Sequence, residues 1–354
     1  MPAQPRRRPI RRRWWISGGA ALLALLLVLA LLVTIRALAP GPGHPVADPE
    51  TKPSAAASFT PSAPQPPFSV VDREPLTLPQ TFRFAQGEFY LQAGSTYLVS
   101  FDLSTVKPED APGVGMYLGV SFNCATEEGR GVGSIGGTEN LLPAEPVSYI
   151  NHLLIEPQAD GVHSCSVRVN APYDDVAAAG TTIDLTAHWR VTEIDGSAHQ
   201  AMGEEHLPRT VTPGQPEVAI EQVIPADELE ETSLTVLSSL HVTTCTGVNG
   251  STENGRTWCA SDDVNETGSS FDVTTKVDVI GADGSVCTPL EADAQSIDID
   301  KWRHHQLIPL ERAVDVPGSL CGDSLRVSVV IENRGPASLV VHESNTSLIT
   351  VAAG

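Results

Sequence analysis

Apolar and polar residues alternate along most of the chain after Phe68, and this alternation predicts β-strands. From Met116 to Cys124, for example, every second side chain is apolar or cysteine. A period of two places successive side chains on opposite faces of a sheet, so that one face is buried and the other meets water. The same pattern recurs in five further segments: 97–103, 165–169, 183–189, 271–279 and 325–331.

Strands with one buried face predict antiparallel sheets that pack face to face in pairs. The chain has 354 residues, and the part with the alternating pattern is long enough for two domains. We therefore expect an all-β protein with two tandem antiparallel β-sandwich domains, of either jelly-roll or Ig-like topology. The expected boundaries are 68–196 for the first sandwich, 197–215 for a linker and 216–354 for the second sandwich.

An internal repeat supports the tandem arrangement. In both 148–155 and 301–308, an aromatic residue is followed by His at +3, Leu at +5 and Ile at +6. This match makes His152 and His305 equivalent. Three further pairs of segments correspond: 96–105 with 235–244, the strand ending in Cys124 with the strand and turn ending in Cys287, and the residues after Cys165 with those after Cys321.

Residues 16–38 are predicted to form a transmembrane anchor. The segment 16–35 contains no charged residue, and a helix needs about 20 apolar residues to cross a bilayer. Six arginines precede this segment and only Arg36 follows it closely. This bias predicts a cytoplasmic tail, residues 1–15, and export of everything beyond the anchor.

Two alternatives to a retained anchor remain open. Ala37-Leu38-Ala39 resembles a signal-peptidase site, although the apolar segment is longer than the roughly 7–15 residues of a signal peptide. Pro40 would also follow the cut directly. Arg12-Arg13 before an apolar run also fits a twin-arginine export signal. All three interpretations place the C-terminal bulk of the chain outside the cytoplasm.

Residues 39–67 are predicted to form an extended linker that lifts the folded part away from the membrane. This segment contains nine prolines, mostly among alanine, serine and glycine. A segment of this composition cannot bury a core, and it favours the polyproline II conformation.

Charge is divided sharply along the chain. The formal net charge is −21, yet residues 1–38 carry seven arginines and no acid, which leaves −28 on the exported part. A nucleic-acid partner is excluded for this part, because phosphate binding requires lysine and arginine. The acidic surface favours solubility through self-repulsion, and binding of cations or of a basic partner is the alternative.

Six cysteines all follow the anchor, and an even number in an exported chain predicts disulfides. The two cysteines of the first sandwich both alternate with core residues, so their bridge should cross the core. The four cysteines of the second sandwich allow three pairings, and the repeat selects one of them. The predicted bridges are Cys124–Cys165, Cys287–Cys321 and Cys245–Cys259.

No catalytic motif is found in the sequence. The segment 133–136 approaches a nucleophile elbow but lacks the glycine two residues before its serine. His304 and His305 are adjacent, so on a strand they point to opposite faces and cannot easily share a metal ion. We therefore expect no enzyme and no cofactor, and we interpret His152 and His305 as half-buried, cross-strand partners of the neighbouring aromatic residue.

Four acidic residues are weak candidates for calcium binding, because calcium takes several oxygen ligands. Two of them share one loop and two share one strand face, although no D-x-D-x-D-G loop is present. Their ordinary interpretation is a solvated surface. The four residues are Asp262, Asp263, Asp298 and Asp300.

Tryptophans are the candidate ligand contacts. Trp189 alternates with core residues and is expected in the core. Trp302 lies between Lys301 and Arg303, so it is expected near the surface, where it could stack against a sugar. Trp258 precedes Cys259 and either packs on the disulfide or contacts a partner.

These observations favour a membrane-anchored, extracytoplasmic binding or structural protein of the cell envelope, without enzymatic activity. Its partner would be a cell-envelope glycan or protein, and its anchor would be a single-pass helix with a cytoplasmic N-terminus. The alternative is a membrane-tethered extracytoplasmic hydrolase whose site carries no recognisable motif.

Overall fold

The structure is a computed structural model, in which Thr60–Gly354 forms one compact unit. The predicted cytoplasmic tail and anchor, and nearly all of the proline-rich linker, lie outside the described residues. No helix among the described residues has the length and apolar character needed to span a bilayer. The described ranges are 63–111, 116–171, 180–203, 209–226, 233–244, 268–299, 302–343 and 345–352.

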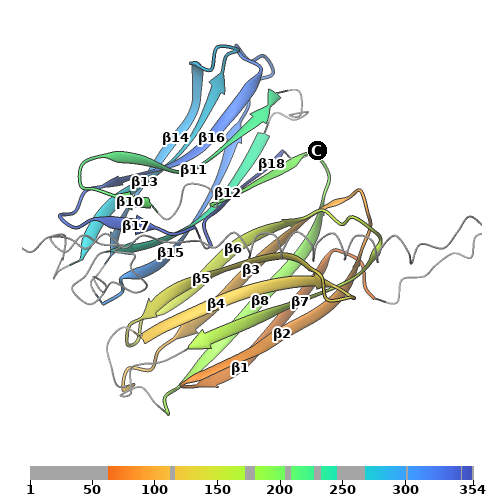
Figure 1. The fold of residues 1–354 in the computed structure, drawn as a ribbon, viewed down its shortest axis with the longest axis vertical. Helices are drawn as coiled ribbons and strands as arrows, with labels where there is room; N and C mark the ends of the chain where they lie inside the picture. Colours follow the sequence, from red (N-terminus) through yellow and green to blue (C-terminus); the bar gives the residue numbers. More distant parts are fainter. Residues whose placement is uncertain are drawn as a thin grey trace, which may run out of the picture. The chain divides into compact units, whose positions relative to one another are not determined.

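The first eight strands form two antiparallel four-stranded sheets that enclose one core (Figure 1). One sheet has the order β1 (Phe68–Thr77), β8 (Thr182–Ile194), β3 (Thr96–Val106) and β6 (Pro146–Ile155). The other sheet has the order β2 (Gln80–Leu91), β7 (Gly161–Ala171), β4 (Met116–Thr126) and β5 (Gly131–Leu141).

The second sandwich repeats this arrangement with one change. One of its sheets has the order β11 (Pro216–Pro225), β16 (Ser324–Asn333), β13 (Ser269–Ile280) and β14 (Val286–Ile299). The other contains β9 (Ala198–Met202), β18 (Ser347–Ala352), β12 (Ser233–Thr244) and β15 (His305–Asp315). β18 covers only the first part of its edge of β12. The last residues of β12 pair with a separate short strand, β17 (Leu339–Val341), which in turn pairs with β10 (Arg209–Val211).

Both sandwiches have the strand order of a jelly roll. In the first, β1 pairs with β8, and β2 pairs with β7 in the opposite sheet. In the second, β9 pairs with β18 and β11 pairs with β16. This wrapping of the first strands onto the last distinguishes a jelly roll from an immunoglobulin sandwich, whose sheets contain strands A-B-E-D and C-F-G. The prediction of an all-β protein with paired antiparallel sheets is confirmed.

Two features differ from the expectations. The segment 197–215, expected as a linker, contributes β9 and β10 to the second sandwich. The register of the repeat is also wrong: it equates Tyr97 with Val236 and Ile155 with Ile308. Tyr97 and Ile155 are strand partners, but Val236 pairs with Arg312 and Ile308 pairs with Leu240. The strands of the two sandwiches therefore correspond one to one. The residue pairing between β12 and β15 differs by four residues from the pairing that the sequence match implies.

The first core is rich in aromatic side chains and is organised around Trp189. This side chain is fully buried, and its indole Nε1 donates a 2.7 Å hydrogen bond to the Ala85 carbonyl. Ala85 lies in an irregularity of β2, where the pairing with β7 shifts. Gly87 completes this feature, because a Cβ atom there would lie 2.8 Å from the Trp189 ring. The prediction that Trp189 belongs to the core is confirmed.

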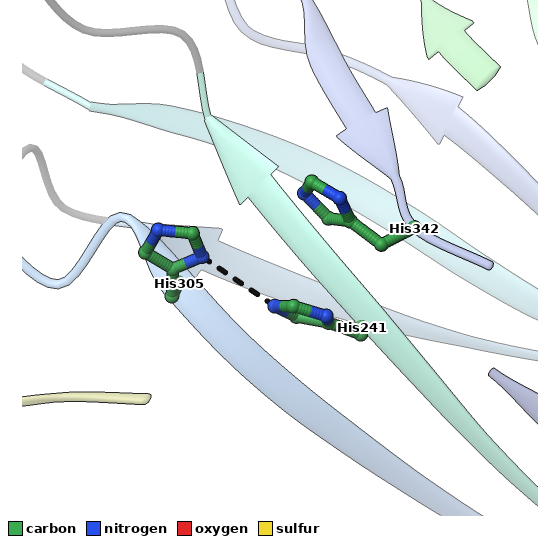
Figure 2. A group of neighbouring side chains, drawn as sticks. All are labelled: His241, His305 and His342. Atoms are coloured by element: carbon green, nitrogen blue, oxygen red, sulfur yellow. Dashed lines mark hydrogen bonds between the residues drawn. The ribbon is translucent and has the colours of Figure 1, made fainter. Parts of the chain in front are cut away.

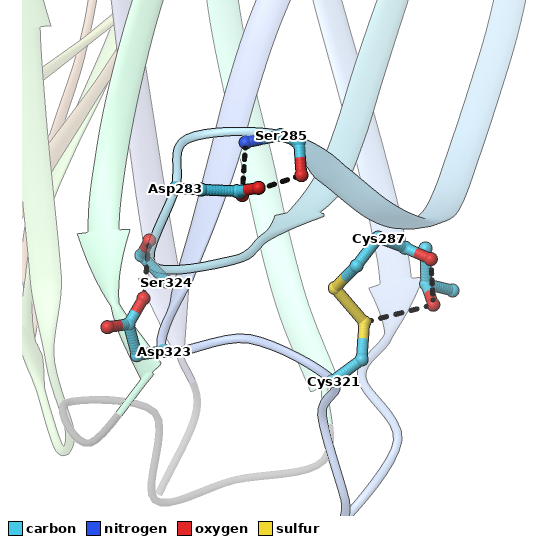
Figure 3. Close-up of a disulfide and its surroundings, with 7 residues drawn as sticks. Asp283, Ser285, Cys287, Cys321, Asp323 and Ser324 are labelled. Carbon is cyan, nitrogen blue, oxygen red and sulfur yellow. Dashed lines mark hydrogen bonds between the residues drawn. A yellow bond between two sulfur atoms is a disulfide. The ribbon is translucent and has the colours of Figure 1, made fainter.

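The described cysteines form two disulfides with different settings. Cys124 and Cys165 are strand partners on β4 and β7, and both are buried. The expectation that this bridge crosses the core is wrong, because both strands belong to one sheet. The second bridge joins Cys287 at the start of β14 to Cys321 before β16, at an exposed end of the sandwich (Figure 3). Cys245 and Cys259 lie outside the described residues.

The first sandwich meets the edge of β15, the outer strand of a sheet in the second. Two backbone N–H groups of β15 that point away from β12 find side-chain acceptors on β5. The His305 N–H donates to Asn140 Oδ1, and the Leu307 N–H donates to Glu139 Oε1, each at 2.7 Å. An uncovered strand edge is a template for pairing with another chain, so these contacts close that edge. The Leu307 side chain also packs into the first core.

The edge of β6 is closed in the same way by the second sandwich. Gln200 on β9 accepts a 2.9 Å hydrogen bond from the Leu154 N–H. Ser239 on β12 donates to the Ile150 carbonyl at 3.3 Å. The outer face of the β12 sheet is therefore covered by the first sandwich, which explains why β12 is buried on both faces.

Candidate functional site

The structure describes only part of the predicted site. Trp302 is 48% exposed, in agreement with its expected position near the surface. Asp298 is an exposed residue of β14. The other candidates lie outside the described residues, so their predicted roles stay predictions: Trp258, Asp262, Asp263 and Asp300.

A cleft of about 540 Å³ lies where the connection between β5 and β6 meets the second sandwich. The first sandwich contributes Glu145, and the side of β14 contributes the predicted candidate Asp298. Arg303, the neighbour of Trp302, and Gln306 also line the cleft. Carboxylates, a guanidinium and an amide therefore surround a space of the size that small ligands occupy.

Arg303 is held in the cleft wall by a buried carboxylate. Its Nε lies 3.2 Å from Glu139 Oε2, and the Glu139 side chain is only 1% exposed. Burial raises the pKa of Glu139 to about 7, although Arg303 and the Leu307 N–H oppose this rise. The guanidinium is thus positioned by the same glutamate that closes the edge of β15.

A second group of functional side chains is a cluster of three histidines, which we call the histidine trio: His241, His305 and His342 (Figure 2). His241 lies on β12, His305 begins β15, and His342 follows β17. One ring nitrogen from each lies within 4.8 Å of the others. Among the described residues, this is the one group of three or more histidine, cysteine, aspartate or glutamate side chains arranged to hold a metal ion.

The Thr243 hydroxyl lies within hydrogen-bond distance of two members of the histidine trio. Its Oγ1 is 2.9 Å from His305 Nδ1 and 2.7 Å from His342 Nε2. His305 Nδ1 is also 3.4 Å from His241 Nε2. Ring nitrogens from three segments of the chain are therefore brought close together.

Strand register explains how the trio forms. Thr243 and His305 are cross-strand partners, and His241 lies two residues from Thr243, so all three side chains share one face of the sheet. His241 lies opposite the break between β17 and β18. At this break the His342 N–H donates to the His241 carbonyl at 2.9 Å, which brings the third ring to the same place.

The environment keeps His305 and His342 uncharged near neutral pH. Burial lowers the pKa of His342 to about 4. Burial, together with the neighbouring histidines, lowers the pKa of His305 well below its usual range. Tyr117 of the first sandwich packs edge-on against the His305 ring, with centroids 5.4 Å apart. This aromatic contact comes from the other sandwich and is not the neighbouring, cross-strand partner that was expected for His305.

His152 has a different setting, although the sequence repeat equates it with His305. Its Nδ1 lies 3.2 Å from the Ser100 hydroxyl on the neighbouring strand. Burial, followed by the charge of Arg190, lowers the pKa of His152 to about 4.

The histidine trio was missed in the sequence because its members are far apart in the chain and no pair is spaced as i, i+2.

Comparisons with known proteins leave the family open. Searches against protein-family models and against curated protein sequences find no match. The chain is similar to the N-terminal CBM22-1–CBM22-2 tandem domain of Paenibacillus barcinonensis Xyn10C, with 9% identity over 80% of this chain and 92% of that one, at a TM-score of 0.25. It is also similar to the infectious bursal disease virus T13 particle protein, with 12% identity over 83% and 73% of the chains, at a TM-score of 0.29.

TM-scores this low carry no conclusion about fold or function. The two disulfides indicate an extracytoplasmic location, because such bonds form and persist in oxidising compartments.

Proposed function

We propose that the protein is a membrane-anchored, non-enzymatic binding module of the cell envelope, and that its ligand is a glycan. The single observation that carries this proposal is the cleft of about 540 Å³ lined by Arg303, whose neighbour in the sequence is the half-exposed Trp302. Residues 16–38 supply the anchor and residues 39–67 the spacer. The two jelly rolls supply a rigid platform, because their facing strand edges are closed against each other.

The chemistry of the cleft suits a polar, uncharged ligand with many hydroxyl groups. Glu145 and Asp298 offer acceptors, Arg303 offers donors, and Gln306 offers both. An indole ring presents a large apolar face against which the C–H face of a sugar can pack. Trp302 directly precedes Arg303 in the chain, so the proposal assigns the stacking role to Trp302.

A binding experiment tests the ligand class. The full-length protein in detergent is incubated with insoluble cell-wall polysaccharide and with soluble oligosaccharides released from it. We expect retention on the polysaccharide and competition by the oligosaccharides. Trp302→Ala should weaken binding roughly five- to tenfold, since an aromatic contact contributes about 1 kcal/mol and 1.4 kcal/mol corresponds to tenfold.

The matched control is Val71→Ala, which removes an apolar side chain that is 66% exposed on β1. This variant should bind as the wild type does. Equal binding by the Trp302→Ala variant would contradict the proposed site. Shortening of the oligosaccharides during incubation would favour the membrane-tethered hydrolase instead.

Attachment to the membrane is tested separately. Protease added to intact spheroplasts should remove residues 39–354 and leave the arginine-rich tail protected. A mature N-terminus at Pro40 would contradict the retained anchor.

A further inference from the structure

We propose that the histidine trio, His241, His305 and His342, binds one divalent transition-metal ion of the zinc type. This site is independent of the cleft and of the glycan proposed for it. Imidazole nitrogens are ligands of zinc, copper and nickel. Three protein ligands with one open position form the donor set of open zinc sites.

The spacing of the ring nitrogens fits such an ion. Two nitrogens that each lie about 2.0–2.1 Å from a tetrahedral zinc ion are separated from one another by roughly 3.3–3.4 Å. His241 Nε2 and His305 Nδ1 are 3.4 Å apart, and all three ligand atoms lie within 4.8 Å of one another. A small rotation of the His342 ring would complete the set.

Thr243 marks the place of the ion. Its hydroxyl lies within hydrogen-bond distance of two of the three nitrogens, and a hydroxyl has one proton, so it can donate to only one of them. The other nitrogen must then carry the proton. When an ion binds, all three facing nitrogens present lone pairs and the ring protons reside on the opposite nitrogens. A water molecule then occupies the fourth position, as in open zinc sites.

The backbone of the trio is fixed before any ion binds. Thr346 Oγ1 accepts a 3.2 Å hydrogen bond from the His241 N–H and donates a 2.7 Å bond to the His342 carbonyl. The backbone N–H of His305 donates a hydrogen bond to Asn140 Oδ1. Ligands held by hydrogen bonds of this kind lose little freedom on binding. His305 and His342 are partly buried, whereas His241 is buried.

The test uses untagged full-length protein in detergent, treated with a chelator that is then removed. Isothermal titration with zinc chloride should show one ion bound per chain. Cobalt(II) in place of zinc should give the visible absorption of a four-coordinate ion with nitrogen ligands. Zinc should also raise the melting temperature, because an ion that binds only the native state stabilises it.

Three variants locate the ion. His342→Gln and His241→Gln each remove one ligand and should weaken zinc binding by more than the 10–100-fold lost with an outer-shell partner. His304→Gln is the matched control, because it removes the histidine adjacent to the trio and should bind zinc as the wild type does. Circular dichroism checks that each variant is folded. If the His241→Gln variant does not fold, the His342→Gln variant alone tests the site, because His342 is only partly buried.

Three outcomes would overturn the proposal. One is the absence of binding at one ion per chain. Another is unchanged affinity in the folded His342→Gln variant. The third is an equal loss of affinity in the His304→Gln variant, which would place the ion elsewhere.

Discussion

The two sandwiches share one strand order but differ in the composition of their cores and in the location of their disulfides. Among the described residues, the first core contains seven buried aromatic side chains: Phe84, Phe89, Tyr97, Phe101, Phe122, Tyr149 and Trp189. The second core is aliphatic, and Phe271 is its one buried aromatic residue among the described residues. The first disulfide lies inside its sheet, whereas the second lies exposed at a strand end. One topology therefore tolerates two quite different interiors.

The sandwiches also differ in continuity, and this difference has chemical consequences. The edge that β1 and β8 form without a break in the first sandwich is divided in the second, into β9 with β18 and β10 with β17. The break places His342 beside His241. A jelly-roll sheet thus gains a cluster of polar groups where its regular pairing stops and where another domain covers it.

Replacement of Trp189 should produce the largest difference between the two cores. Trp189→Ala leaves a cavity in a core of rigid rings and removes the partner of the Ala85 carbonyl, so we expect a loss of about 3–5 kcal/mol in the free energy of unfolding. Phe271→Leu in the aliphatic core should cost less than about 1.5 kcal/mol. Urea unfolding followed by far-UV circular dichroism measures both. Similar losses in the two variants would contradict the contrast between the cores.

The two disulfides should respond differently to reduction. Cys287–Cys321 is exposed, so dithiothreitol should reduce it in the native protein, with a loss of stability of typically 2–4 kcal/mol. Cys124 and Cys165 are each 2% exposed, so their bridge should persist until the sandwich unfolds. Thiol labelling followed by peptide mass spectrometry distinguishes the bridges. Reduction of both bridges at one rate would show that burial does not separate them.

Glu139 should make stability depend on pH at the boundary of the sandwiches. Burial raises its folded-state pKa to about 7 from the ordinary value of 4.5 for a glutamate. The folded state therefore holds the proton more tightly, and the corresponding stability is present below pH 4.5 and is lost as pH rises through 7. At 1.36 kcal/mol per pKa unit, the loss approaches about 3 kcal/mol.

The variant Glu139→Gln isolates this effect, since glutamine keeps an acceptor for the Leu307 N–H without the titration. The stability of the wild type relative to this variant should fall between pH 4.5 and pH 8 in urea unfolding. Glu74→Gln is the matched control, because Glu74 is exposed on β1. A difference between wild type and Glu139→Gln that does not change with pH would be evidence against a buried, titrating Glu139.

Asn140 should show the smallest effect, through the closed edge of β15. Asn140→Ala leaves the His305 N–H without this acceptor, which typically costs about 1–3 kcal/mol for a buried donor. Asn170→Ala is the control. Asn170 accepts a hydrogen bond from Thr81 at an exposed site, so its loss should stay within about 0.5 kcal/mol. Equal stability of the two variants in thermal unfolding would show that the edge contact contributes little.

The sequence alone determined the features that depend on local periodicity. Alternation along β3, β4, β7 and β8 predicted which faces are buried, and Trp189 was placed in the core because it falls on the apolar phase of its strand. The presence of disulfides followed from an even number of cysteines in an exported chain. These inferences hold because the side-chain period of a strand is set by its own backbone.

The tertiary structure alone decided whatever depends on register and on contacts between distant strands. The strand pairing of the second sandwich is shifted by four residues from the pairing that the sequence repeat implies. Register depends on contacts between strands, and a match between two sequence segments does not contain that information. The assignment of β9 to a sheet required the position of β18, more than 140 residues away. His241, His305 and His342 carry no mutual signal in the chain, and only the pairing of β12 with β15 and the break after β17 bring their rings together.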